Sequence, residues 1–243
     1  EANAVAVRIA RSASERENVA FCGYHGWHDW YLAANLKNKK ILDEHLIPDL
    51  DPIGVPSNLQ NTSFSFQYNN INQLEKLVDK KNIGVIKMEV SRSTQPNIEF
   101  LRKVRKLATK KNIVLIFDEC TSAFRENFGG LHLKYKIQPD LAMFGKALGN
   151  GYPITSIIGK KSIMETLSDS FVSSTFWSDR IGPTAGLASL KEMENQKSWE
   201  ILLNLGYYFR KKFKNFDQKD LIEINKEGII PNISLKLNPL KTN

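Results

Sequence analysis

Short apolar runs alternate with amphipathic stretches through most of the sequence, and this alternation limits the folds that the chain can adopt. The stretches between the runs repeat apolar residues every three or four positions, which is typical of helices with one buried face. Strands that alternate with helices favour an α/β fold, in which helices cover a mainly parallel sheet. The predicted strands are residues 18–23, 83–90, 113–119, 140–145 and 154–159, and the predicted helices among them are residues 69–81 and 98–112.

The last part of the sequence has a different pattern. Residues 182–196 and 199–216 predict two helices, and the segment after them is β-like. We therefore expect a large domain over residues 1–197 and the start of a smaller α+β domain over residues 198–243. The chain opens within a helical pattern and stops without a closing element, so we expect the large domain to be truncated at its N-terminus and the small domain to be incomplete.

Charge and cysteine content narrow the classes of function. The sequence has 34 Lys and Arg against 26 Asp and Glu, a net charge of +8, but its lysines are scattered and no nucleic-acid reading motif is present. No apolar run approaches the roughly 20 residues of a membrane span. The two cysteines form no CxxC pair, which favours a reducing compartment. We expect a cytoplasmic protein that binds neither nucleic acid nor membrane, with a basic nucleic-acid-binding domain as a competing hypothesis.

Ionisable residues follow three of the predicted strands. Glu89 ends one strand, Asp118 and Glu119 end the next, and Lys146 follows another. In mainly parallel sheets, ligands bind outside the carboxyl ends of the strands. We therefore expect these side chains to converge on one edge of the sheet, although each of them could also be an ordinary surface residue.

Lys146 lies in the stretch DLAMFGKALGNGYPI, between an apolar run and a glycine-rich turn. These surroundings look buried, and burial would lower the pKa of a lysine amine and make it a nucleophile. Such an amine most often forms a Schiff base with a carbonyl, and pyridoxal 5′-phosphate (PLP) is the commonest carbonyl cofactor. The structural alternative is a surface lysine in a turn.

A PLP site needs further groups, and the sequence has candidates for them. A carboxylate must face the pyridine nitrogen, and Asp118 closes an apolar strand. A flat ring must stack on the cofactor, which Tyr24 or His25 could provide. Hydroxyls must hold the phosphate, and the stretch VSSTFWS, which includes Thr175, precedes a predicted helix. The structural alternatives are a turn or cap residue for Asp118 and Thr175, and ordinary packing for the two rings.

Several motifs, in the same order, resemble those of the class III PLP-dependent aminotransferases. FDECTSAFR and FGKALGNGYPI resemble the aspartate and lysine motifs of that family, YHGWHD its ring-stacking motif, and SSTFWSDRIGPTAGLASL its phosphate-threonine segment. Within the family, the sequence is most similar to the branch that contains glutamate-1-semialdehyde 2,1-aminomutase. The resemblance implies a large domain of fold type I. It also implies PLP-dependent transfer of an amino group, by a transaminase or 2,1-aminomutase, between a small-molecule amino donor and a keto or aldehyde acceptor.

The resemblance implies roles for the residues around the cofactor. Lys146 would form the Schiff base with PLP and then move the α-proton. Asp118 would pair with the pyridine nitrogen. Tyr24 and Cys120 would pack against the two faces of the ring, and His25 belongs to the same motif as Tyr24.

Two further residues belong to the periphery of the implied site. Thr175 would reach the phosphate of the neighbouring subunit's cofactor, which implies a homodimer. Glu89 matches the glutamate near the substrate, although MEVSRSTQP lacks the proline that the family has after it. Glu89 could equally be a salt-bridged strand end.

The histidines show no metal-ligand spacing, so we expect no metal site. The alternative function is that of a non-catalytic or truncated relative that serves only as a fold or dimerisation unit.

Overall fold

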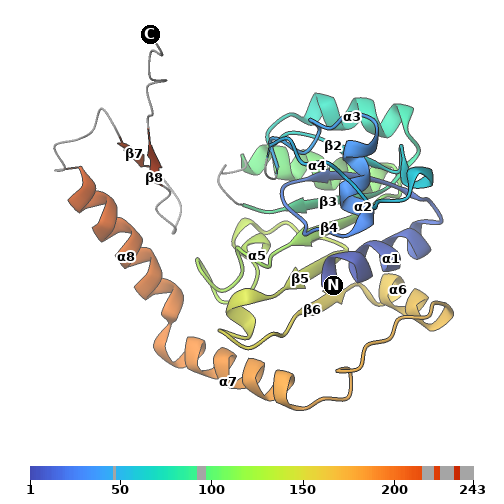
Figure 1. The fold of residues 1–243 in the computed structure, drawn as a ribbon. Helices are drawn as coiled ribbons and strands as arrows, with labels where there is room; N and C mark the ends of the chain where they lie inside the picture. The colour runs from blue at the N-terminus through green and yellow to red at the C-terminus, as the bar shows by residue number, and fades with distance from the viewer. Residues whose placement is uncertain (46–47, 92–96, 215–221, 225–232, 236–243) are drawn as a thin grey trace, which may run out of the picture.

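The computed structural model describes residues 1–45, 48–91, 97–214, 222–224 and 233–235. Its centre is a six-stranded sheet with the order β2-β1-β3-β4-β5-β6 (Figure 1). The first five strands along the chain pair in parallel, and β6 runs antiparallel to β5. The strands are β1 (Asn18–Cys22), β2 (Ser63–Ser65), β3 (Ile83–Glu89), β4 (Val114–Asp118), β5 (Leu141–Phe144) and β6 (Ser156–Gly159).

Helices cover both faces of this sheet. Helix α1 (Ala2–Ser14) packs on one face, where Ala6 and Ile9 join an apolar cluster with strand residues of alternate positions. Helices α3 (Ile71–Lys80) and α4 (Ile98–Lys110) pack on the opposite face (Figure 1). Shorter helices connect these elements: α2 (Asp29–Leu32), η1 (Ala33–Leu36), η2 (Ser57–Leu59), α5 (Leu131–Tyr135), η3 (Lys146–Leu148), α6 (Lys161–Met164) and η4 (Glu165–Asp169).

Local sequence explains where the two long covering helices begin. The side chain of Asn70 accepts a hydrogen bond from the backbone N–H of Gln73, and the side chain of Asn97 accepts one from Glu99. Each asparagine thereby satisfies one of the N–H groups that a helix leaves without a partner in its first turn. The apolar residues of each helix then recur on one face, as its periodicity predicts.

Two long helices leave the body of the sheet and form an arm. Helix α7 (Ile181–Gln196) and helix α8 (Ser198–Phe213) are joined at Lys197, whose φ of 48° is left-handed (Figure 1). Beyond them, β7 (Ile222–Ile224) pairs antiparallel with β8 (Ile233–Leu235). The predicted domain boundary after residue 197 coincides with this joint and stays a prediction. None of the helices within the described ranges has the length and apolarity that a membrane crossing requires.

The structure confirms the predicted class, a mainly parallel sheet covered by helices. It differs from the sequence prediction at the two edges of the sheet. The predicted strand at residues 154–159 is the antiparallel edge strand β6, and the parallel edge strand β2 was not predicted. A strand of three residues, Ser63–Ser65, is too short to show a period-two pattern, and its formation depends on pairing with β1.

Candidate active site

The ends of three neighbouring parallel strands bring ionisable side chains to one edge of the sheet. Glu89 and Asp118 are partners in the register between β3 and β4, and Asp118 is the partner of Met143 across β5. Lys146 follows β5 after a turn at Gly145. The convergence that the sequence predicts is therefore present for Glu89 and Asp118, at the carboxyl ends where parallel sheets bind ligands.

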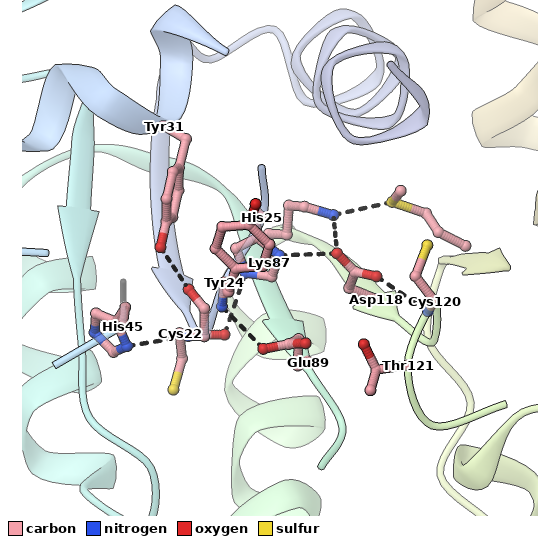
Figure 2. Close-up of polar contacts among 12 residues, drawn as sticks. Cys22, Tyr24, His25, Tyr31, His45, Lys87, Glu89, Asp118, Cys120 and Thr121 are labelled. Carbon is pink, nitrogen blue, oxygen red and sulfur yellow. Dashed lines mark hydrogen bonds and ion pairs between the residues drawn. The ribbon is translucent and has the colours of Figure 1, made fainter. Parts of the chain in front are cut away.

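Asp118 is the centre of a buried polar cluster (Figure 2). Its side chain is 3% exposed, and its Oδ2 atom lies 2.9 Å from Nδ1 of His25 and 3.6 Å from Nζ of Lys87. Its Oδ1 atom accepts a hydrogen bond from the backbone N–H of Cys120 at 3.1 Å. Burial raises the pKa of the Asp118 carboxyl. The charge of Lys87 and the hydrogen bond from His25 outweigh burial, so the net pKa lies well below its usual value.

His25 lies beneath the strand edge rather than in solvent. Its ring is fully buried, and its Nε2 atom is 3.2 Å from the backbone oxygen of Cys22. Burial, and then the positive charge of Lys87, lower the pKa of His25 to about 4, against the opposing effect of Asp118. At neutral pH, a neutral imidazole with its proton on Nδ1 can donate to the Asp118 carboxylate. The structure thus places His25 as a partner of Asp118, which sequence reasoning did not anticipate.

Lys87 is one residue of this site that sequence reasoning missed. It is fully buried in the middle of β3, where it contacts Oδ2 of Asp118 and donates to Sδ of Met143 at 2.9 Å. Residues at alternate positions of a strand face the same side, so Lys87 shares the α1 side with Val85. Its signal in the sequence was a single lysine between Ile86 and Met88 in an otherwise apolar run. Fully buried lysines are rare unless they are paired.

The turn after β1 is tied to the end of β3 (Figure 2). Glu89 is buried, and its Oε2 atom accepts a hydrogen bond from the backbone N–H of Tyr24 at 2.9 Å. The carbonyl of Gly23 accepts a hydrogen bond from the hydroxyl of Tyr31 at 2.9 Å. Gly23 has a φ of +102°, and a Cβ atom there would lie 2.7 Å from Oε2 of Glu89. Glu89 therefore holds the backbone that carries Tyr24 and His25.

The structure corrects the expectation that Lys146 is buried. Leu148 and the strand before Gly145 are buried, but the side chain of Lys146 is exposed, because the chain turns at Gly145 and Lys146 begins η3. The φ of Lys146 is 42°, an uncommon left-handed conformation for a residue with a side chain. Its Nζ atom donates to Oγ1 of Thr121 at 2.6 Å. Thr121 follows Asp118 by three positions, so the short loop after β4 links the lysine to the carboxylate.

A cavity lies beside Lys146. It measures about 620 Å³, and Lys146 lines it together with Arg125, Asn150 and Glu192, among other residues. A lysine amine that is exposed at a cavity of this size is accessible to a small molecule. Thr121, whose hydroxyl contacts this amine, was not among the residues that the sequence singled out.

Two further residues that the sequence singled out are Cys120 and Thr175. Cys120 is a half-buried free thiol, and burial, followed by the charge of Asp118, raises its pKa to about 12. Thr175 is exposed in the turn that precedes α7. Within the described part of the chain, Thr175 shares no hydrogen bond with the Asp118 cluster. The described residues also contain no group of three or more His, Cys, Asp or Glu that could hold a metal ion.

Comparisons with known proteins agree on the kind of protein that the chain resembles. The model of the family described as aminotransferase class-III matches residues 1–241. The chain is 28% identical to a 3-aminobutyryl-CoA aminotransferase of Cloacimonas acidaminovorans, over 97% of the chain and 56% of that protein. It is 31% identical to a glutamate-1-semialdehyde 2,1-aminomutase of Methanobrevibacter smithii, over 98% of the chain and 57% of that protein.

A solved structure supports the fold. The FumI protein of Sphingopyxis sp. MTA144, solved in its PLP internal aldimine form, matches with a TM-score of 0.77 and 21% identity, over 95% of this chain and 55% of that one. The likeness shows that the two chains share a fold over this length. In all three comparisons, the chain spans little more than half the length of the protein that it matches.

Proposed function

Because this chain belongs to the aminotransferase class-III family, we propose that it carries the cofactor-binding part of an enzyme that transfers amino groups with PLP. The observation that carries the proposal is the buried Asp118 carboxylate at the end of β4, three positions before Thr121, whose hydroxyl contacts the amine of Lys146. A buried anion and an accessible amine, which hydrogen-bonds to the loop that follows the anion, are the two protein groups that pyridoxal chemistry requires.

The residues present fit PLP by their chemistry. Asp118 has a pKa well below its usual value, so it is ionised and can accept a hydrogen bond from a ring nitrogen. The amine of Lys146 is exposed and can hold the cofactor covalently. When bound, PLP supplies an aldehyde that condenses with amines and a ring that stabilises negative charge on the adjoining carbon. Binding, orientation and proton transfer come from the side chains of this chain.

Lys146 has two tasks in this proposal. Its amine holds the cofactor at rest, and, once free, accepts the proton from the α-carbon of the amino donor. The hydroxyl of Thr121, 2.6 Å from Nζ, restricts the positions that this flexible side chain adopts. The backbone at Lys146 has an uncommon left-handed conformation, with a φ of 42°.

Three residues would orient and enclose the cofactor. His25 donates to Asp118 and so keeps the carboxylate in place, and it therefore acts on the ring through Asp118. Tyr24 is half-buried on the turn that Glu89 holds, so we propose that its ring stacks on the cofactor. Cys120 packs beside Asp118 as a neutral thiol, in keeping with a packing role on the other side of the ring.

Further parts of the proposal concern the complete protein. We propose that it is a homodimer in which Thr175, exposed in the turn before α7, reaches the phosphate at the neighbouring site. The substrates would be a small-molecule amino donor and a keto or aldehyde acceptor. Whether the amino group moves to a second molecule or to a neighbouring carbon separates a transaminase from an aminomutase.

The free thiols of Cys22 and Cys120 are in keeping with a reducing compartment such as the cytoplasm.

Covalent capture of the cofactor tests this function. The complete protein is incubated with PLP and reduced with borohydride, and peptide mass spectrometry then identifies the lysine that carries a pyridoxyl group. We expect label on Lys146, no specific label in Lys146→Ala, and unchanged label in Lys161→Ala, which removes an exposed lysine elsewhere. A folded protein that takes up no label with PLP in excess would overturn the proposal and favour a non-catalytic fold or dimerisation unit.

A further inference from the structure

Lys87 has no task in the function proposed above, although its position is energetically demanding. It is fully buried within an apolar cluster, and burial lowers its pKa, against the opposing charges of Asp118, Cys120 and Glu89. Removing a charged amine from water carries a large penalty unless a partner compensates for it. The partner here is the carboxylate that would also face the cofactor ring, 3.6 Å from Nζ.

The surroundings of Lys87 leave Asp118 as its main ionic partner. On β5, which is separated from β3 by β4 in the sheet, Met143 offers a thioether sulfur at 2.9 Å, which is a weak and uncharged acceptor. Helix α1 contributes apolar residues to this cluster. Glu89, two positions along the same strand, is directed to the backbone of Tyr24. The positive charge of Lys87 therefore acts chiefly on Asp118.

The acceptor sites of Asp118 are largely in use before any ligand arrives. An ionised carboxylate has about four acceptor sites. His25 and Lys87 approach Oδ2, and the backbone N–H of Cys120 occupies one site on Oδ1. This count leaves room for one more donor on Asp118, but the negative charge already has a cation beside it.

We propose that Lys87 is a positioning residue that gives Asp118 a permanent counter-charge, so that the carboxylate does not depend on a positively charged ring nitrogen in its ligand. This inference rests on the proposed function for the identity of the ligand. A carboxylate without a resident cation would favour the protonated form of a pyridine ring strongly, because an unpaired charge in a buried site is costly. With Lys87 in place, that preference is weakened.

Two ligands that differ at one ring atom test the inference. The probes are PLP and its 1-deaza analogue, in which a C–H group replaces the ring nitrogen, and their dissociation constants for the complete protein are measured by absorbance at pH 7. We expect the wild type to discriminate weakly between them. In Lys87→Met the preference for PLP should rise by about tenfold, which is the effect of roughly one strong charge-assisted contact. Lys103→Met, the same change on the exposed side of α4, should leave the ratio of the two dissociation constants unchanged.

A second variant and a ligand-free measurement keep the result interpretable. Lys87→Gln retains a donor without the charge, so it should behave like Lys87→Met if charge is the cause. In the protein without ligand, the ring of His25 is titrated by NMR. Removal of Lys87 removes one of the effects that lower the pKa of His25, so this pKa should rise from about 4.

Each outcome has a distinct meaning. An unchanged ratio and an unchanged His25 titration in both variants would overturn the role of Lys87, even if PLP binds normally. If the wild type binds neither probe, the proposed function fails, and the His25 titration alone decides whether Lys87 acts as a cation on this cluster.

Discussion

Nδ1 of His25 lies 2.9 Å from Oδ2 of Asp118, although the two residues are 93 positions apart in the sequence. One comes from the turn after β1 and the other from the end of β4, and β3 lies between these two strands in the sheet. The side chain of Lys87, on β3, reaches the same carboxylate oxygen (Figure 2). A buried carboxylate is thus held by groups from three strands, which fixes its position before any ligand binds.

The burial of His25 beside Lys87 predicts a dependence of stability on pH. Because the pKa of His25 is about 4 in the folded protein and about 6.5 when unfolded, the unfolded chain binds the extra proton first as pH falls. The free energy of unfolding should therefore decrease between pH 6.5 and pH 4.5, by about 2–3 kcal/mol from this group. The pKa of Asp118 is depressed, so this residue loses its contribution to the free energy of unfolding only at lower pH.

Urea unfolding of the complete protein at several pH values measures this effect. In His25→Phe, the free energy of unfolding should depend less on pH between pH 6.5 and pH 4.5, because the proton uptake of His25 is removed. His28→Phe replaces a half-exposed ring stacked on Trp27 and serves as the matched control. A His25→Phe profile with the wild-type slope would show that His25 titrates normally in the folded state.

Substitution of Gly23 should be more damaging than substitution of Gly26. Both glycines have left-handed φ values, +102° and +91°, so alanine introduces backbone strain at either position. A Cβ atom at Gly23 would also lie 2.7 Å from Oε2 of Glu89, whereas nothing lies within 4 Å of one at Gly26. We expect Gly23→Ala to cost about 1–3 kcal/mol more than Gly26→Ala, measured by thermal or urea unfolding. Equal costs would mean that the contact with Glu89 relaxes freely.

Removal of the Thr121 hydroxyl should slow the reaction of Lys146 without unfolding the protein. The hydroxyl is 2.6 Å from Nζ, and valine retains the shape of the side chain without the acceptor. We expect Thr121→Val to lower the rate of PLP attachment by about tenfold, because the amine loses the hydrogen bond that positions it. Stopped-flow absorbance measures that rate, and Thr121→Ser should restore most of it. A Thr121→Val rate equal to that of the wild type would remove Thr121 from the site.

The two cysteines should resist alkylation in the folded protein. The pKa of Cys120 is about 12, and burial raises the pKa of Cys22 well above its usual value. The reactive thiolate is thus a fraction of about 10⁻⁴ of Cys120 at pH 8. We expect iodoacetamide at pH 8 to modify both residues only after unfolding in urea, as read by peptide mass spectrometry. Rapid modification of native Cys120 would indicate that the loop after β4 opens.

Much of the fold was predictable because it depends on local periodicity. The predicted helices at residues 69–81 and 98–112 and the predicted strand at residues 83–90 match α3, α4 and β3 to within one or two residues at each end. The direction of β6 and the existence of β2 were not predictable, since both depend on which distant strand lies alongside.

The sequence by itself determined the order of the elements and the placing of Asp118 and Lys146 at strand ends, because apolar spacing and flanking turns are local properties. The tertiary structure decided which lysine is buried: Lys87 lies inside and Lys146 is exposed, the reverse of what the neighbours of Lys146 suggested. It also decided that His25 contacts Asp118. Burial and ion pairing depend on the elements packed against a residue, and those elements come from distant parts of the chain.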